Sequence, residues 1–315
     1  MKLFHSLLYP LLGGLFCLSC SDDEQDSGTK QPTTAGEVTF GVDLTGFSTR
    51  VTQDGSSWND GDKIGTYVLD MKTLEPVTEA ANVPYVCSEE GASGFFPSTT
   101  PLKVQNDGTP VKFVAYYPYN ADVRNFNYPV QLAAQERGST ACDLLYAATK
   151  EEYTYSPENE PHISLNFTHR LAKVILKFVN MEKEPLEVSD VRIEGMQTAA
   201  SFNIQTDVLT VDESSVATIN PYHNATTGFY EAIILPSALT DSYKVSFVLD
   251  DREKEWIFTN LDIALPQFHK GYSYTFALYI DDSGFVEMGR LENVEGGNSS
   301  APWEDGSRED GTAEG

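Results

Sequence analysis

The chain has 315 residues, of which 47 are aspartate or glutamate and 21 are lysine or arginine, and its formal net charge is −26. No basic stripe occurs along the sequence, so a nucleic acid is not expected as a partner. Such a charge favours solubility and disfavours nonspecific contact with anionic surfaces.

The amino terminus has the composition of a secretory signal peptide, which we predict over residues 1–19. Lys2 precedes an apolar run, Leu3–Leu18, which Pro10 interrupts. A positive charge followed by a short apolar core is typical of such signals. The run is too short and too broken to favour a membrane-spanning helix, which needs ~20 apolar residues.

Cys20 follows the apolar run, and its context resembles the signal of bacterial lipoproteins, although Cys17 stands where that signal has an aliphatic residue. The resemblance implies cleavage before Cys20 and a lipid on its sulfur, a diacylglycerol with fatty acids such as palmitate. The alternative is an ordinary signal that leaves Cys20 as a free thiol. A metal site with Cys17 is disfavoured, because no second cluster of cysteine and histidine completes it.

Residues 20–36 are predicted to form a disordered acidic tether. The acidic run Asp22–Glu24 is followed by glycine, serine, threonine, glutamine and proline, a composition that cannot bury apolar surface. The acidic run resembles the surface-export signal of Bacteroidetes lipoproteins. That resemblance implies a lipoprotein exposed on the surface of the cell outer membrane.

Beyond the tether, alternation of apolar and polar residues is common, and long helical periodicity is hard to find. Short helical turns are predicted only near residues 141–148. Strands are predicted at residues 38–44, 111–117, 163–167, 174–178, 244–249, 256–258 and 272–280, with 244–258 forming a hairpin. Short strands that are rich in Tyr, Phe, Val and Thr indicate an all-β fold made of β-sandwiches.

The length of the chain after the signal suits two domains of ordinary size. We predict an N-terminal β-sandwich domain over residues 37–168 and a C-terminal β-sandwich domain over residues 169–295. The remaining residues, 296–315, are rich in glycine and acidic side chains, and we predict an acidic flexible tail there.

The segment Asn59–Asp62 is predicted to be a tight turn, with Trp58 and Ile64 anchoring a hairpin core on either side. Asp54 and the two aspartates of the turn also suggest a calcium loop. They lack the full alternation of oxygen ligands and the closing glutamate of such a loop, so the turn is the favoured interpretation. No metal or cofactor is predicted.

The sequence gives no support for an enzyme. His169 is interpreted as a packed or hydrogen-bonded histidine at the junction between the domains. The other histidines after the signal, His162, His223 and His269, have no serine, cysteine or paired glutamate at catalytic spacing. No glycine-rich phosphate loop and no HExxH motif is present.

Cys87 and Cys142 are the cysteines that remain after the signal segment. They could form one disulfide bond in an oxidising exterior. They could equally be small buried thiols. Two cysteines do not decide between these alternatives.

Several stretches together resemble the fimbrillin-like lipoproteins of Bacteroidales, the subunits and accessory proteins of type V pili. These stretches are STRVTQDGSSWNDGDKIGTYV (48–68), VKFVAYYPY (111–119), DLLYAAT (143–149), LNFTHRLAKVILKF (165–178), GFYEAIILPS (228–237) and FHKGYSYTFALYI (268–280). The resemblance implies two tandem transthyretin-like β-sandwich domains, export as a lipoprotein and other fimbrillin subunits as partners.

The first predicted strand is central to how such a protein would assemble. Val38, Phe40, Val42 and Leu44 would bury one face, which contributes about 6–12 kcal/mol before entropy is counted. Removing the strand would expose an apolar groove and two unpaired edges, which favour a replacement strand. By resemblance, an arginine-specific protease would cut at Arg50, and a neighbouring subunit would donate a strand by donor-strand exchange.

The carboxy terminus is a poor donor strand, because residues 296–315 show no apolar alternation. Residues 285–294 are a weak substitute. We therefore expect a tip or accessory pilin with a role in adhesion to a host or bacterial surface ligand. A stalk or anchor pilin is one alternative. A surface glycan-binding lipoprotein outside a pilus is another, with sugars stacking on Tyr116, Tyr117, Tyr119, Tyr222 or Tyr230.

Overall fold

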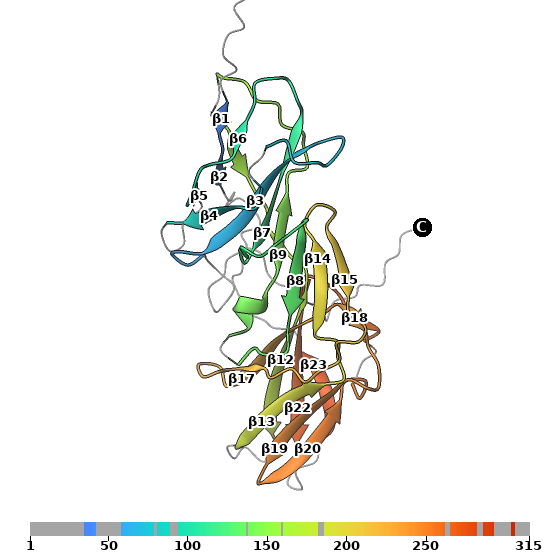
Figure 1. The fold of residues 1–315 in the computed structure, drawn as a ribbon. Coiled ribbons are helices and arrows are strands. Elements are labelled where there is room, and N and C mark those ends of the chain that lie inside the picture. The colour runs from blue at the N-terminus through green and yellow to red at the C-terminus, as the bar shows by residue number, and fades with distance from the viewer. Residues whose placement is uncertain are drawn as a thin grey trace, which may run out of the picture. The chain divides into compact units, whose positions relative to one another are not determined.

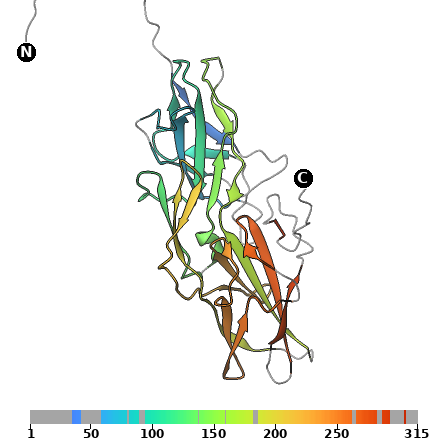
Figure 2. The same cartoon turned by 90° about the vertical axis from the view of Figure 1, so that its right-hand side faces the viewer.

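A computed structural model describes residues 35–41, 58–78, 81–88, 94–136, 138–158, 160–181, 186–261, 265–281, 286–292 and 304–305. Over these residues the fold is all-β, with one short 3-10 helix, η1 (Ser139–Cys142) (Figure 1 and Figure 2). In this described part, no helix has the length and apolar character needed to cross a membrane.

The first sheet has eight strands in the order β10-β2-β5-β4-β3-β7-β9-β11. Figure 1 labels β2, β5, β4, β3, β7 and β9 of this sheet. Their bounds are β2 Thr39–Gly41, β3 Lys63–Asp70, β4 Val83–Cys87, β5 Gly94–Pro97, β7 Val111–Tyr117, β9 Leu145–Ala148, β10 His162–Ser164 and β11 Thr168–His169. β2 runs parallel to β10, and the other pairs are antiparallel. A small ladder of β1 (Gly36–Glu37) and β6 (Lys103–Val104) extends the first strand backward.

One hydrophobic cluster fills the inside of this sheet, and we call it the first core. It contains Val38 and Phe40 from the first strand, Trp58 and Ile64 from the next segment, and Phe167 near β11. Alternation in 161–169 explains the last of these, because Ile163, Leu165 and Phe167 are buried while the residues between them are exposed.

The second half of the chain forms a sheet in the order β16-β17-β12-β22-β23, with β24 beside β22, and a sheet in the order β13-β19-β20. Their bounds are β12 Ala172–Asn180, β13 Val188–Glu194, β16 Tyr222–Asn224, β17 Phe229–Ile234, β19 Lys244–Leu249, β20 Arg252–Ile257, β22 Tyr272–Ile280, β23 Val286–Glu292 and β24 Glu304–Asp305. The short strands β18 (Ser237–Ala238) and β21 (Gln267–Phe268) pair with each other. Both larger sheets contribute side chains to a second core, which includes Leu176, Phe247 and Phe276.

Another sheet, which we call the junction sheet, joins strands from both halves of the chain in the order β15-β14-β8. β8 (Asn127–Gln131) pairs with β14 (Ala199–Asn203), which in turn pairs with β15 (Val208–Val211). This sheet contributes to a third core together with Tyr67, Tyr116 and Tyr146 of β3, β7 and β9. The third core therefore rests on residues that lie far apart in the sequence.

Gln135 stabilises the contact between the two halves of the chain. Its buried side chain hydrogen-bonds to the backbone of β17, as a neighbouring strand would. Its amide nitrogen donates to the carbonyls of Ile233 at 2.7 Å and Leu132 at 2.8 Å, and its amide oxygen accepts from the Ile233 N–H at 2.7 Å. One side chain thus satisfies both backbone groups of a buried residue.

Most of the predicted strands are confirmed. The run 111–117 is β7, and the hairpin 244–258 is β19 and β20, joined at Asp250 and Asp251, which both have the positive φ angles of a tight two-residue turn. The alternating run 272–280 is β22. The domain boundaries stay a prediction.

The helical turns predicted near residues 141–148 are wrong in their second half. The 3-10 helix ends at Cys142, and β9 occupies Leu145–Ala148. Leu145, Tyr146 and Ala147 are all buried, because β9 is packed on both faces. A short apolar run of this kind carries no alternation that would separate a strand from a helix.

Candidate functional site

The first strand, by which we mean residues 36–41 with β1 and β2, is built into the interior of its sheet. β2 lies between β5 and β10, with Phe40 paired to Phe95 on one side and to Ile163 on the other. The connections continue at its ends, where the Val38 N–H donates to the Leu102 carbonyl and the Thr39 N–H donates to the Pro161 carbonyl, both at 2.9 Å. Removing this segment would leave unpaired backbone groups on both neighbours.

The side chains of the first strand face the first core. Val38 and Phe40 are fully buried, and the ring of Phe40 meets Tyr85 edge-on at 4.8 Å and Phe113 edge-on at 5.9 Å between ring centres. Burial of these two side chains contributes about 3–6 kcal/mol before entropy is counted. Val42 and Leu44, the other members of the predicted alternation, lie outside the described residues.

Tyr85 bonds the first strand to the segment before β6. Its hydroxyl donates to the Val38 carbonyl at 2.9 Å and accepts from the Leu102 N–H at 3.0 Å. Burial raises the pKa of Tyr85 to about 12, so the hydroxyl keeps its proton at every physiological pH. Departure of the first strand would leave this buried hydroxyl without its acceptor.

Replacing Tyr85 with phenylalanine is expected to lower the free energy of unfolding by about 1–3 kcal/mol, because the buried Leu102 N–H and Val38 carbonyl lose their shared partner. Urea denaturation measures the change. Tyr153→Phe is the matched control, since the Tyr153 ring packs on Phe113 while its hydroxyl bonds to no described residue. Equal effects of the two substitutions would contradict the role of the Tyr85 hydroxyl.

Two glycines let the first strand pass close to its neighbours. A Cβ on Gly36 would lie 2.5 Å from the Tyr155 ring, and a Cβ on Gly41 would lie 2.5 Å from the His162 ring. Thr39 adds a hydrogen bond between its hydroxyl and His162 Nδ1 at 3.0 Å. The segment is therefore shaped to this position at both ends.

The turn predicted at Asn59–Asp62 is confirmed. The Asp62 N–H donates to the Asn59 carbonyl at 3.1 Å, Gly61 has a φ of +85°, and Trp58 is buried in the first core. Burial raises the pKa of the Asp62 carboxyl. Hydrogen bonds from the Asn59 N–H at 2.7 Å and the Tyr117 hydroxyl at 3.2 Å act in the opposite direction and offset part of this increase in pKa. Asp54 lies outside the described residues, among which no group of three acidic, histidine or cysteine side chains is placed to hold a metal ion.

The interpretation of His169 as a buried, hydrogen-bonded residue is confirmed. Its Nδ1 lies 3.0 Å from Oδ1 and 2.8 Å from Oδ2 of Asp143, and both side chains are nearly enclosed. This pair joins β11 to the segment before β9. It holds the chain where the first sheet ends and β12 begins.

The two cysteines do not form a disulfide bond in this structure. Cys87 is buried in the first core, whereas Cys142 packs against the third core. Burial raises the pKa of the Cys142 thiol, which favours the unreactive protonated form. Cys20 and Arg50, the predicted lipid-attachment and processing residues, lie outside the described residues.

The tyrosines considered for sugar stacking are packed to different degrees. Tyr116 and Tyr117 are buried, so their faces are closed to a sugar. Tyr119, Tyr222 and Tyr230 are half-buried. The weak donor segment predicted at residues 285–294 contains β23, which is already hydrogen-bonded to β22 of its own chain.

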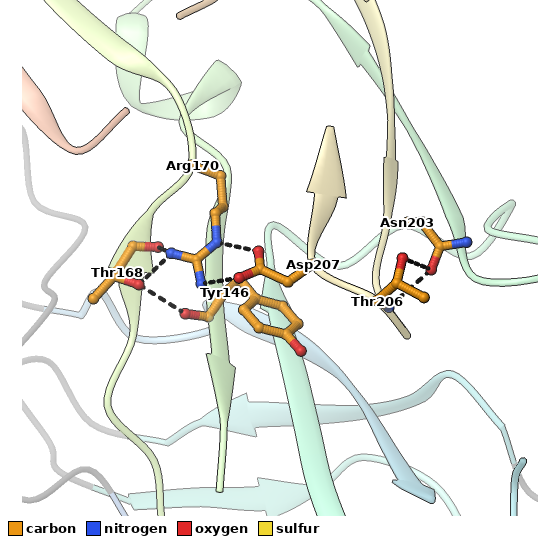
Figure 3. Close-up of polar contacts among 6 residues, drawn as sticks. All are labelled: Tyr146, Thr168, Arg170, Asn203, Thr206 and Asp207. Atoms are coloured by element: carbon orange, nitrogen blue, oxygen red, sulfur yellow. Dashed lines mark hydrogen bonds and ion pairs between the residues drawn. The ribbon is translucent and has the colours of Figure 1, made fainter. Parts of the chain in front are cut away.

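A cluster around Arg170 is the main feature that the sequence did not indicate. The Arg170 guanidinium donates two hydrogen bonds to the Asp207 carboxylate, from Nε to Oδ1 at 2.5 Å and from Nη2 to Oδ2 at 3.0 Å (Figure 3). It also lies 4.8 Å from the centre of the Tyr146 ring. It also donates to the hydroxyl of Thr168. The cluster connects the turn of the β14–β15 hairpin, which holds Asp207, to β9 and β11 at the end of the first sheet.

Comparisons with known proteins identify relatives of this fold. A family model described as "Fimbrillin-like" matches residues 49–303. The crystal structure of a candidate cell adhesion protein from Bacteroides uniformis has a TM-score of 0.67 and 21% identity, and covers 82% of this chain and 98% of that one. A candidate cell adhesion protein from Bacteroides ovatus has a TM-score of 0.61 and 15% identity, with 84% and 97% covered. No curated protein matches the chain.

Proposed function

The chain belongs to the fimbrillin-like family, and from this premise we propose that it is a cell-surface fimbrial subunit of the tip or accessory kind. In this proposal it joins other fimbrillin subunits by strand exchange and contributes to adhesion. The observation that carries the proposal is the first strand, whose backbone is bonded on both sides and whose side chains fill the first core. The family is not an enzyme family, and similar structures from Bacteroides are described as candidate cell adhesion proteins.

The proposal includes a location and a domain plan. A signal peptide, 1–19, is removed, Cys20 carries the lipid, and the tether 20–36 leads from the cell outer membrane to the folded part. Two transthyretin-like β-sandwich domains follow, at 37–168 and 169–295, and an acidic tail ends the chain. The separate first and second cores support such a plan.

Assembly begins with hydrolysis of the peptide bond after Arg50 by a protease that is specific for arginine. This cut frees the first strand from the rest of the chain while β5 and β10 stay in place. The slot between β5 and β10 then exposes the backbone groups of Phe95 and Ile163. It also exposes the apolar side chains around Tyr85. A strand from a neighbouring subunit restores these bonds and contacts.

The carboxy-terminal part supports the tip or accessory position. β23 is bonded to β22, and Glu304 of the short strand β24 pairs beside Tyr272. Neither segment is unpaired in the way that a donor strand requires. A stalk or anchor pilin is the alternative within the family, and an anchor would keep both its lipid and its first strand.

Processing is tested by sequencing the amino terminus of protein extracted from cells, together with lipid labelling. The wild-type protein in fibres is expected to begin at Val51 and to lack lipid. The variant Arg50→Ala is expected to begin at lipid-bearing Cys20 and to be absent from fibres, while Arg252→Ala, a change at an exposed arginine of β20, behaves as wild type. Wild-type protein that enters fibres with its first strand attached would contradict strand exchange, and a lipid-bearing wild type at the fibre base would identify an anchor.

A further inference from the structure

A groove of about 780 Å³ opens where the first sheet fails to close on itself. We call it the β9–β10 groove. Its walls are the edges of these two strands, and its lining includes Ala147, Ala148, Thr149, Ser164, Asn166 and Phe167. It lies on the side of β10 that faces away from β2, so it is separate from the slot of the first strand.

The opening follows from the path of residues 162–169. This segment pairs with β2 through His162–Ser164 and then with β9 through Thr168–His169. It crosses from one end of the sheet to the other and joins the two ends at the Thr168–Tyr146 pair. Before that pair the segment and β9 separate, which leaves a wedge between Ser164 and Ala148.

The hydrogen bonds on the outer sides of β9 and β10 show which backbone groups face the wedge. The Leu165 N–H donates to the Gly41 carbonyl at 2.9 Å, so odd-numbered residues of β10 face β2 and Ser164 faces the groove. The Thr149 N–H donates to the Phe113 carbonyl at 3.0 Å, so Ala148 faces the groove from the other side. Among the described residues no strand pairs with Ser164 or Ala148 on this side.

The narrow end of the wedge is fixed by the Arg170 cluster. Arg170 bonds to Asp207 and Thr168 and covers the Tyr146 ring, which holds β9 and β11 together there (Figure 3). Both charges of the ion pair are thereby engaged with each other. The wide end is left with Lys150, Glu151 and Glu152, which are exposed.

Unpaired backbone groups on two facing strands are complementary to one kind of occupant, an extended polypeptide that pairs with both. The two glutamates outnumber Lys150 on the rim, and the whole chain carries a formal charge of −26. This charge disfavours an acidic segment, including the carboxy-terminal residues of a second copy, and favours a basic one.

We propose that the β9–β10 groove binds a short extended peptide segment of another protein, flanked by lysine or arginine. The occupant adds a strand between Ala148 and Ser164 and completes the ring of strands around the first core. The groove is open with the first strand in place, so the proposal does not rest on strand exchange.

The test measures binding of the synthetic peptide acetyl-KTVTVTK-amide to the full chain by isothermal titration calorimetry. Ser164→Pro removes the N–H that faces the groove and keeps the bonds of Ile163 and Leu165 to β2, so binding is expected to weaken about tenfold. Ser164→Ala, which keeps the N–H, is the matched control and is expected to bind as wild type. Ala148→Pro makes the same change on the opposite wall, and thermal melting checks that each variant folds.

Further outcomes separate this proposal from its competitors. The peptide acetyl-ETVTVTE-amide is expected to bind more weakly, and added salt is expected to weaken binding of the lysine peptide. Hydrogen exchange at the Leu165 N–H is expected to stay slow, because β2 remains bound. Unchanged binding in both proline variants, loss of Leu165 protection, or binding of a glycan rather than the peptide at Ser164 would overturn the proposal.

Discussion

Replacing Phe40 with alanine is expected to lower the free energy of unfolding by about 3–5 kcal/mol. Phe40 is fully buried and meets Tyr85 and Phe113 edge-on, so its loss removes apolar contact and leaves a cavity under the first strand. Urea denaturation of the full chain measures the change. The slope of the unfolding free energy against urea concentration should stay unchanged. Phe96→Ala is the control on the neighbouring strand β5, because Phe96 is 52% exposed and its truncation should cost less than about 0.5 kcal/mol.

The same variant shows whether the first strand can leave without unfolding the rest. The Leu165 N–H donates to Gly41 and the Val38 N–H donates to Leu102, so both report on the first strand by hydrogen exchange. In Phe40→Ala these two amides should exchange faster relative to amides of the β19–β20 hairpin. Uniform acceleration across the molecule would mean that the strand detaches only with global unfolding, which would argue against a removable strand.

Replacing Gln135 with alanine is expected to lower the free energy of unfolding by about 2–6 kcal/mol, because the buried N–H and carbonyl of Ile233 both lose their partner. Thermal or urea denaturation measures the effect. Gln205→Ala is the matched control, since the Gln205 amide makes one bond, to the Leu74 carbonyl at 2.7 Å, in a half-buried position. A Gln135 variant no less stable than the control would show that water can replace the side chain.

Strands packed on one face show alternation in the sequence, whereas β7, which is buried on both faces, could be predicted from its run of Val, Phe and Tyr. In the run 161–169 buried and exposed residues alternate, and this alternation is visible in the letters. β9 was missed because it is only four residues long and is covered on both faces, so its sequence shows no alternation. Alternation therefore reports how a strand is packed, and it disappears when both faces are apolar.

The site itself could be predicted only in part. Val38 and Phe40 were identified because they alternate, but the parallel pairing of β2 with β10 joins residues that are 123 positions apart, as in Thr39 and His162. Tyr85 and its partner Val38 are 47 positions apart, and Gln135 and Ile233 are 98 apart. Which polar group meets which backbone is decided by the register of distant strands, about which a single sequence carries no direct information.

The junction sheet also covers an aromatic face that is formed by earlier parts of the chain. The aromatic face formed by Tyr67, Tyr116 and Tyr146 is complete once β9 has been made, yet part of its cover, β14 and β15, comes later in the chain. Until β14 and β15 have followed and paired, that face lacks part of its cover. A chain that ends after β9 would therefore expose an aromatic surface that favours association with other chains.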